Sequence, residues 1–157
     1  MTCRFILPLL LLAMQSALPA QDVDALLRKG EDALGSQLWE MAALHFSECL
    51  EINDLDAEAK SHAAIRLAEA WIRDGKAAEA LDLLGQSFVA DHPEAPFWKG
   101  QALAGLGRFA DAVSTLSPLL QNPETPFRSE AVYTTANLEL ALGKPEAAIA
   151  TLSGLAE

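Results

Sequence analysis

The residues best able to do chemistry in this chain are three histidines, two cysteines and a scatter of carboxylates. The histidines share no spacing typical of a metal or catalytic motif: His45, His62 and His92. The acid-rich segment 54–58 lacks the glycine and the terminal glutamate of a calcium loop, which favours a solvated connector. No phosphate-binding glycine loop or nucleophile motif occurs either. We therefore predict no metal, no cofactor and no catalytic residue, and a protein that is not an enzyme.

The first twenty residues have the order of a secretory signal peptide. A weakly positive start precedes the apolar run 5–14, and small residues follow up to Ala20. The run is short and contains Pro8, which favours a cleaved signal over a membrane anchor. We predict residues 1–20 as the signal peptide. The mature chain would be periplasmic or extracellular and would have no stable membrane span. Of the two cysteines only Cys49 would remain, and a buried, inert thiol is expected there.

The chain is strongly acidic for its size. Its 157 residues carry a formal net charge of -11, and 51% of them are hydrophobic, enough for one modest domain. Nucleic-acid binding requires lysine and arginine to displace the counterions of the phosphate backbone. We therefore predict no nucleic-acid partner.

One phrase of the sequence recurs. Residues 107–119 read GRFADAVSTLSPL and residues 143–155 read GKPEAAIATLSGL, with further copies beginning at Gln37 and Gly75. The copies share an alanine: Ala42, Ala80, Ala112 and Ala148. A large apolar residue follows four positions later: Phe46, Leu84, Leu116 and Leu152. A small residue precedes each alanine by twelve positions: Gly30, Ala68, Gly100 and Ala136. Small residues at helix crossings, with large ones a turn later, predict tightly packed helical hairpins. Four glycines mark the expected turns: Gly35, Gly75, Gly107 and Gly143.

This pattern resembles that of tetratricopeptide-repeat (TPR) proteins, whose 34-residue unit carries small, aromatic and large apolar residues at these places. The resemblance covers residues 21–157. It implies an all-α fold, a right-handed superhelical array of about four TPR-like helical hairpins, with units at about 23–54, 61–92, 93–124 and 129–157. Such units bury their apolar faces only by stacking on their neighbours.

In this family the first helix of each hairpin lines a concave groove, which the resemblance implies as the partner-binding site. The positions that carry over form an apolar row: Leu27, Ile65, Phe97 and Tyr133. A polar row lies about one turn further on: Glu31, Glu69, Gln101 and Asn137. These rows suit a peptide or protein partner with apolar anchors and some positive charge. The alternative is that they pack against adjacent helices.

Trp98 is a further candidate. The other units have Arg28, Arg66 and Thr134 at its place, which predicts an exposed position and an interface anchor. The alternative is half-buried packing.

The resemblance as a whole favours a non-catalytic protein–protein interaction scaffold of the cell envelope. One alternative is a structural assembly block that self-associates through its last hairpin, whose segment ends apolar. Another is an accessory subunit of an envelope machine.

Overall fold

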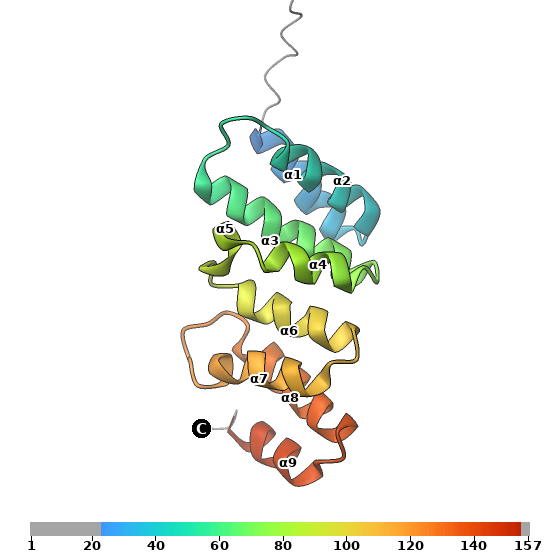
Figure 1. Ribbon diagram of the computed structural model, residues 1–157, viewed down its shortest axis with the longest axis vertical. Helices are drawn as coiled ribbons and strands as arrows, with labels where there is room; N and C mark the ends of the chain where they lie inside the picture. The colour runs from blue at the N-terminus through green and yellow to red at the C-terminus, as the bar shows by residue number, and fades with distance from the viewer. Residues whose placement is uncertain (1–22, 155–157) are drawn as a thin grey trace, which may run out of the picture.

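The computed structural model describes residues 23–154 as an elongated stack of helices (Figure 1). No strand occurs within this range. The helices in chain order are α1 (Val23–Gly35), α2 (Trp39–Leu50), α3 (Ala57–Arg73), α4 (Ala77–Leu84), α5 (Ser87–Ala90), α6 (Ala95–Gly105), α7 (Phe109–Leu120), α8 (Arg128–Ala141) and α9 (Pro145–Ser153). The predicted signal peptide lies outside the described residues.

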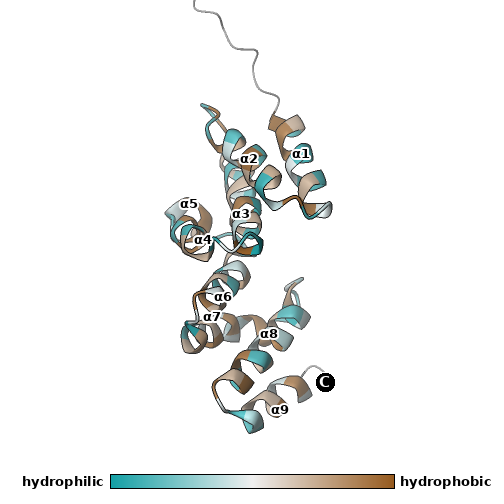
Figure 2. Ribbon diagram, turned by 90° about the vertical axis from the view of Figure 1, so that its right-hand side faces the viewer, coloured by the Kyte–Doolittle hydropathy of each residue, from teal (hydrophilic) through white to brown (hydrophobic). Residues whose placement is uncertain are grey.

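The long helices form four hairpins: α1–α2, α3–α4, α6–α7 and α8–α9. Each of these helices contacts the next one along the array, both within a hairpin and between hairpins. The four-residue helix α5 lies between the second and third hairpins and contacts α3 and α4. In Figure 2 apolar and polar stretches alternate along the helices, as expected where each helix packs on neighbours at its sides. The all-α hairpin array predicted from the sequence is confirmed.

The four hairpins turn in the same way. In each, the amide of the residue after the turn donates to a carbonyl five positions earlier, as Lys76 N does to Trp71 O at 2.7 Å. This bond is typical of a Schellman motif, which needs one residue with a left-handed backbone. Glycine supplies that residue in three hairpins: Gly75, Gly107 and Gly143, with φ between +73° and +81°. In the first hairpin Gln37 does so, with φ of +60°. The expectation that Gly35 marks this turn was wrong, because Gly35 is the last residue of α1.

The helices of a hairpin cross where the sequence places its small residues. A β-carbon added to Gly30 would lie 2.5 Å from Phe46 Cζ, and one added to Gly100 would lie 2.5 Å from Leu116 Cδ2. The corresponding residues of the second and fourth hairpins are Ala68 and Ala136, both almost fully buried. The close approach of the helices therefore depends on the absence of larger side chains at these four positions.

The buried alanines and large apolar residues of the second helices form the centre of the core. Phe46, Leu84 and Leu116 are fully buried, whereas Leu152, at the same place in the fourth hairpin, is 40% exposed. Cys49 is buried, as expected, and this burial raises the pKa of its thiol. Within residues 23–154, no helix combines the length and the apolar character that crossing a membrane would need.

Candidate partner-binding surface

The predicted apolar row does not form a continuous open groove. Ile65 is fully buried and Phe97 is 5% exposed, so both belong to the core of the array. Leu27, at the first end of the row, is half-buried, and Tyr133, at the other end, is 57% exposed. The prediction that Ile65 and Phe97 line an open groove was therefore wrong, whereas the alternative of packing against neighbouring elements holds for them.

The connections between hairpins cover the middle of the row. Phe127, just before α8, stacks on Phe97 with ring centroids 4.4 Å apart. Val89 of α5 is fully buried in the same apolar cluster as Ile65. The second and third members of the row are thus buried in a core to which the segments between the hairpins also contribute.

Trp98 is buried as well, which corrects its prediction as an exposed anchor. Its side chain is among the core residues, and its Nε1 donates to Glu94 Oε2 at 3.2 Å. Its ring packs edge-on against Phe97 with centroids 5.0 Å apart. Polar residues at this place in the other units do not indicate exposure, because the side chain of Arg66, at the same place in the second hairpin, is itself only 16% exposed. The position is enclosed in the interior of the array and open only at its start.

The predicted polar row, like the apolar row, is more buried in its middle than at its ends. Glu69 is 8% exposed and pairs with two arginines of its own helix. Gln101 is half-buried and donates to Thr134 Oγ1 at 3.0 Å, joining α6 to α8. Glu31 on α1 and Asn137 on α8 are exposed. Open members of the two rows thus remain at both ends of the array.

Arg66 links carboxylates from three helices. Its Nη1 donates to Glu69 Oε2 at 2.6 Å, and its Nη2 donates to Glu94 at the start of α6. Its Nε lies 3.8 Å from Glu31 Oε1 on α1. A guanidinium presents several donors in a fixed plane, which suits one cation shared among several carboxylates. Arg66 therefore joins α3 to the start of α6 and lies within ion-pair distance of Glu31.

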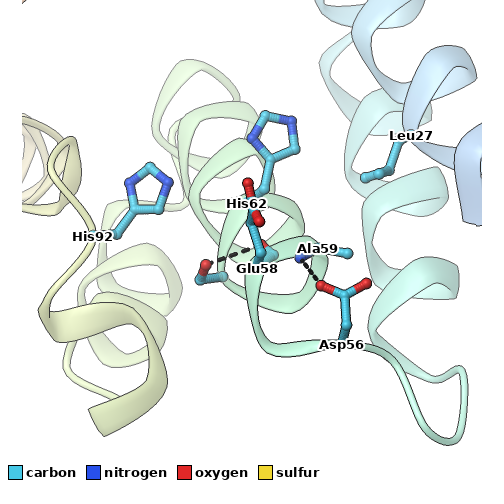
Figure 3. A pocket seen from close by; sticks show the side chains of 7 residues that line it. Leu27, Asp56, Glu58, Ala59, His62 and His92 are labelled. Atoms are coloured by element: carbon cyan, nitrogen blue, oxygen red, sulfur yellow. Dashed lines mark hydrogen bonds between the residues drawn. The ribbon is translucent and has the colours of Figure 1, made fainter.

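Beside this cluster lies a hollow of about 400 Å³ (Figure 3). We call it the acidic hollow; its lining residues are Leu27, Asp56, Glu58, Ala59, Ser61, His62 and His92. Figure 3 shows Leu27 on α1 across the hollow from His92, with His62 on α3 between them. The N-terminus of α3 fixes the remaining wall, because Asp56 accepts a hydrogen bond from Ala59 N at 2.9 Å and caps the helix.

Carboxylates set the charge of the acidic hollow. His62 Nε2 lies 3.2 Å from Glu31 Oε1, and the hydrogen bond from His62 lowers the pKa of Glu31. Burial lowers the pKa of His92, whose Nδ1 accepts a hydrogen bond from Glu94 N at 3.2 Å. His92 is therefore a neutral imidazole at pH 7 and does not offset Asp56 and Glu58. The hollow combines one apolar wall with a negative rim.

The described part of the chain shows no group of three or more histidine, cysteine, aspartate or glutamate side chains arranged to hold a metal ion. His62 and His92 approach the same hollow but are held by Glu31 and by the backbone of Glu94. The arrangement is suited to electrostatic and apolar contact with a ligand.

The two central hairpins match a known family of repeats. Residues 61–86 and 93–117 match the family model described as tetratricopeptide repeat. Two hairpins of the chain match the tetratricopeptide repeat. The first matched segment includes most of α3 and all of α4, and the second includes α6 and most of α7. A search of the curated proteins found no match. Tetratricopeptide repeats are typically non-catalytic modules that mediate protein–protein interaction.

Sequence reasoning missed most of the acidic hollow. His62 was predicted to belong to no metal or catalytic motif, and segment 54–58 was predicted to be a solvated connector. The available signal was Asp56, an N-cap residue placed before a helical segment that also carries His62. His92 left no such signal, because it lies in the connection that precedes α6.

Proposed function

We propose that this chain is a non-catalytic protein–protein interaction scaffold of the cell envelope that binds a cationic segment of a partner in the acidic hollow. The two matched repeats support the interaction role, since tetratricopeptide repeats generally bind other proteins. The predicted signal peptide supports export to the periplasm or the extracellular space.

The observation that carries the proposal is the composition of the acidic hollow. Leu27 offers an apolar wall, while Asp56, Glu58 and the neighbouring Glu31 offer carboxylates. A hollow of about 400 Å³ has room for one or two side chains of a peptide. A lysine or arginine beside an apolar residue is complementary to this surface in both charge and polarity. The ligand is thus an extended or helical peptide segment that carries both kinds of residue.

The exposed Tyr133 and Asn137 on α8 are proposed as a second contact for the same partner. They belong to the same rows as Leu27 and Glu31 but lie three hairpins further along the array. The closed stretch around Phe97 separates the two ends. A partner that uses both ends would cross this closed stretch without inserting a side chain there.

A second candidate function is self-association through α9. Ile149 is 66% exposed and Leu152 is 40% exposed, although the residues at the place of Leu152 in the other hairpins are fully buried. Apolar side chains exposed together in this way are typical of surfaces that another helix covers. The chain would then be a structural assembly block.

The test is a pull-down from cell-envelope extract with the exported chain and two variants matched in charge. One variant, Glu31→Gln, Asp56→Asn and Glu58→Gln, removes the carboxylates of the acidic hollow while keeping a capping residue before α3. The control, Glu79→Gln, Asp111→Asn and Glu146→Gln, removes three carboxylates from the second helices of the hairpins. Circular dichroism establishes that all three proteins are equally helical.

We expect a partner that the wild type and the control capture and the first variant does not. Its capture should weaken as salt is raised, because the contact is electrostatic. Equal capture by all three proteins would exclude the acidic hollow as the binding site. Capture of the chain's own copies alone, lost on Ile149→Lys, would favour the assembly block.

A further inference from the structure

The first hairpin exposes a row of apolar side chains on its second helix. Leu38, just before α2, is 55% exposed, and Met41 and Leu44 on α2 are 47% and 49% exposed. The three residues are spaced by three positions, so they lie on one face of the helix. We call this row the α2 ridge.

The other hairpins show what the fold requires at these positions. The equivalent triplets, counted from the shared alanine, are Lys76, Glu79 and Asp82; Arg108, Asp111 and Ser114; and Lys144, Ala147 and Ala150. Two hairpins thus have a base, an acid and a polar residue there, and those side chains are exposed. The fold tolerates charge along this row, so packing does not explain the three large apolar residues of the α2 ridge. Grouped apolar exposure of this kind marks an interaction surface.

A hollow lies on each side of the ridge. One of about 270 Å³ is lined by Gln37, Leu38, Trp39, Glu40, Met41 and Asp74. The other, of about 280 Å³, is lined by Lys29, Asp32, Ala33, Ser36, Leu38, Met41 and His45. Leu38 and Met41 therefore stand between two depressions, which gives the surface the relief that the side chains of a second helix can fill. Neither hollow shares a residue with the acidic hollow.

The charges around the ridge indicate what occupies it. Helix α2 carries Glu40 and Glu48 and has no lysine or arginine. Asp32 lies in one hollow and Asp74 in the other. They are opposed by Lys29, by Lys76, which pairs with Asp74 at 2.6 Å, and by Arg73, whose guanidinium lies 5.3 Å from the Trp39 ring centroid. The charged groups around the α2 ridge are negative on balance, and the whole chain has a formal net charge of -11. Like charge disfavours an anionic membrane surface and a second copy of this chain, whereas a cationic partner is attracted.

We propose that the α2 ridge docks a cationic amphipathic α-helix of a partner protein. Leucine and methionine of the ridge receive the apolar stripe of that helix, and its lysines or arginines meet Glu40, Glu48 and the aspartates of the hollows. This site is independent of the acidic hollow. It gives the scaffold a further binding surface, built by the first hairpin together with Asp74 at the end of α3.

The test measures binding of a fluorescent 18-residue peptide of leucine and lysine, arranged as an amphipathic helix, by fluorescence anisotropy. The ridge variant, Leu38→Lys, Met41→Glu and Leu44→Asp, installs the triplet that the second hairpin already carries. It makes the chain one charge more negative, so simple attraction of the peptide is not reduced. The control, Leu106→Lys, Leu140→Glu and Phe88→Asp, makes the same charge change at exposed apolar residues elsewhere. Circular dichroism and thermal unfolding check that both variants remain folded.

We expect the ridge variant to lose roughly tenfold or more in affinity, the size of effect expected when interface anchors are removed. The control should stay within about twofold of the wild type. A matching leucine–glutamate peptide should bind the wild type at least roughly tenfold more weakly, because the rim is negative.

Three results would each overturn the proposal. The first is equal affinity of the ridge variant and the wild type, or equal binding of the lysine and glutamate peptides. The second is a wild-type dimer in light scattering that becomes a monomer in the ridge variant, which would assign the ridge to a second copy. The third is binding to phosphatidylglycerol vesicles that the ridge variant loses, which would assign it to a membrane. If the acidic hollow fails its own test while the ridge variant still loses the peptide, only the proposed function is excluded.

Discussion

Phe127 stacks face to face on Phe97, with ring centroids 4.4 Å apart and ring planes 9° apart. Phe97 lies on α6, and Phe127 precedes α8, so the stack joins the third hairpin to the fourth. Trp98 adds an edge-on contact to Phe127 with centroids 6.0 Å apart. Phe127 lies in the segment between α7 and α8. The aromatic contact therefore fixes this segment over the Phe97 side chain.

Replacement of Phe127 with alanine should destabilise the chain by about 2 kcal/mol. The expected loss is smaller than that of a fully buried phenylalanine, because Phe127 is partly exposed, but it includes the aromatic pairing. Urea unfolding followed by circular dichroism measures the change. Phe88→Ala is the control, since Phe88 is more exposed and outside the stack. Equal losses of stability in the two variants would show that the aromatic stack contributes no additional stability.

Replacement of Gly100 with alanine should also destabilise the chain, by about 1 kcal/mol net. The new methyl group would lie 2.5 Å from the Cγ and Cδ2 atoms of the fully buried Leu116, and this overpacking outweighs the better helix propensity of alanine. In the double variant Gly100→Ala, Leu116→Val the combined loss should be smaller than the sum of the two single losses, and thermal unfolding of the wild type, both single variants and the double variant completes the cycle. A higher melting temperature for Gly100→Ala would contradict the tight crossing.

The hairpins could be predicted from the sequence because helix crossings leave a signature in residue size. A fully buried crossing admits glycine or alanine at positions such as Gly30 and Gly100, and this restriction recurs at a nearly constant spacing. Stacking then follows, because a single hairpin leaves one apolar face uncovered.

The binding surface could not be predicted in the same way, because it depends on segments that lie outside the repeat. Ile65 and Phe97 were expected to line an open groove, but Ile65 is buried in the same cluster as Val89, and Phe97 stacks on Phe127; Val89 and Phe127 both come from segments between the hairpins. Neither connection has a periodic pattern that would reveal where it folds. His92 enters the acidic hollow from one of these connections for the same reason.

Replacement of Gln37 with glycine should stabilise the chain by about 0.5–1 kcal/mol. Gln37 has a φ of +60°, where a β-carbon is unfavourable, and the three equivalent residues are glycines. The gain is limited because glycine also has more freedom to lose on folding. The reciprocal change, Gly75→Gln, should destabilise the chain by about 1 kcal/mol, and urea midpoints measure both. A loss of stability in Gln37→Gly would mean that the glutamine side chain makes compensating contacts in the hollow beside the α2 ridge.

The stability of the chain should fall in two steps as the pH is lowered. Burial lowers the pKa of His92 below its ordinary 6.5, so the unfolded chain binds the proton more readily and stability decreases as the pH falls from 6.5 through the folded pKa. The hydrogen bond from His62 lowers the pKa of Glu31 below 4.5. The stability that this carboxylate contributes is fully present above pH 4.5 and is lost as the pH falls through its folded pKa.

The variant His92→Gln should therefore lose the upper step and keep the lower one. Glutamine fills a similar space and does not titrate. Between about pH 7 and pH 5 the variant's free energy of unfolding should therefore fall less than that of the wild type. Urea midpoints measured at intervals from pH 7.5 to about pH 3 give both curves, and Glu31→Gln should keep the upper step and lose the lower one. His45→Gln on α2 serves as the control, because His45 does not line the acidic hollow and its replacement leaves His92 in place. An upper step that persists in His92→Gln and disappears in His45→Gln would assign the titration to the first hairpin.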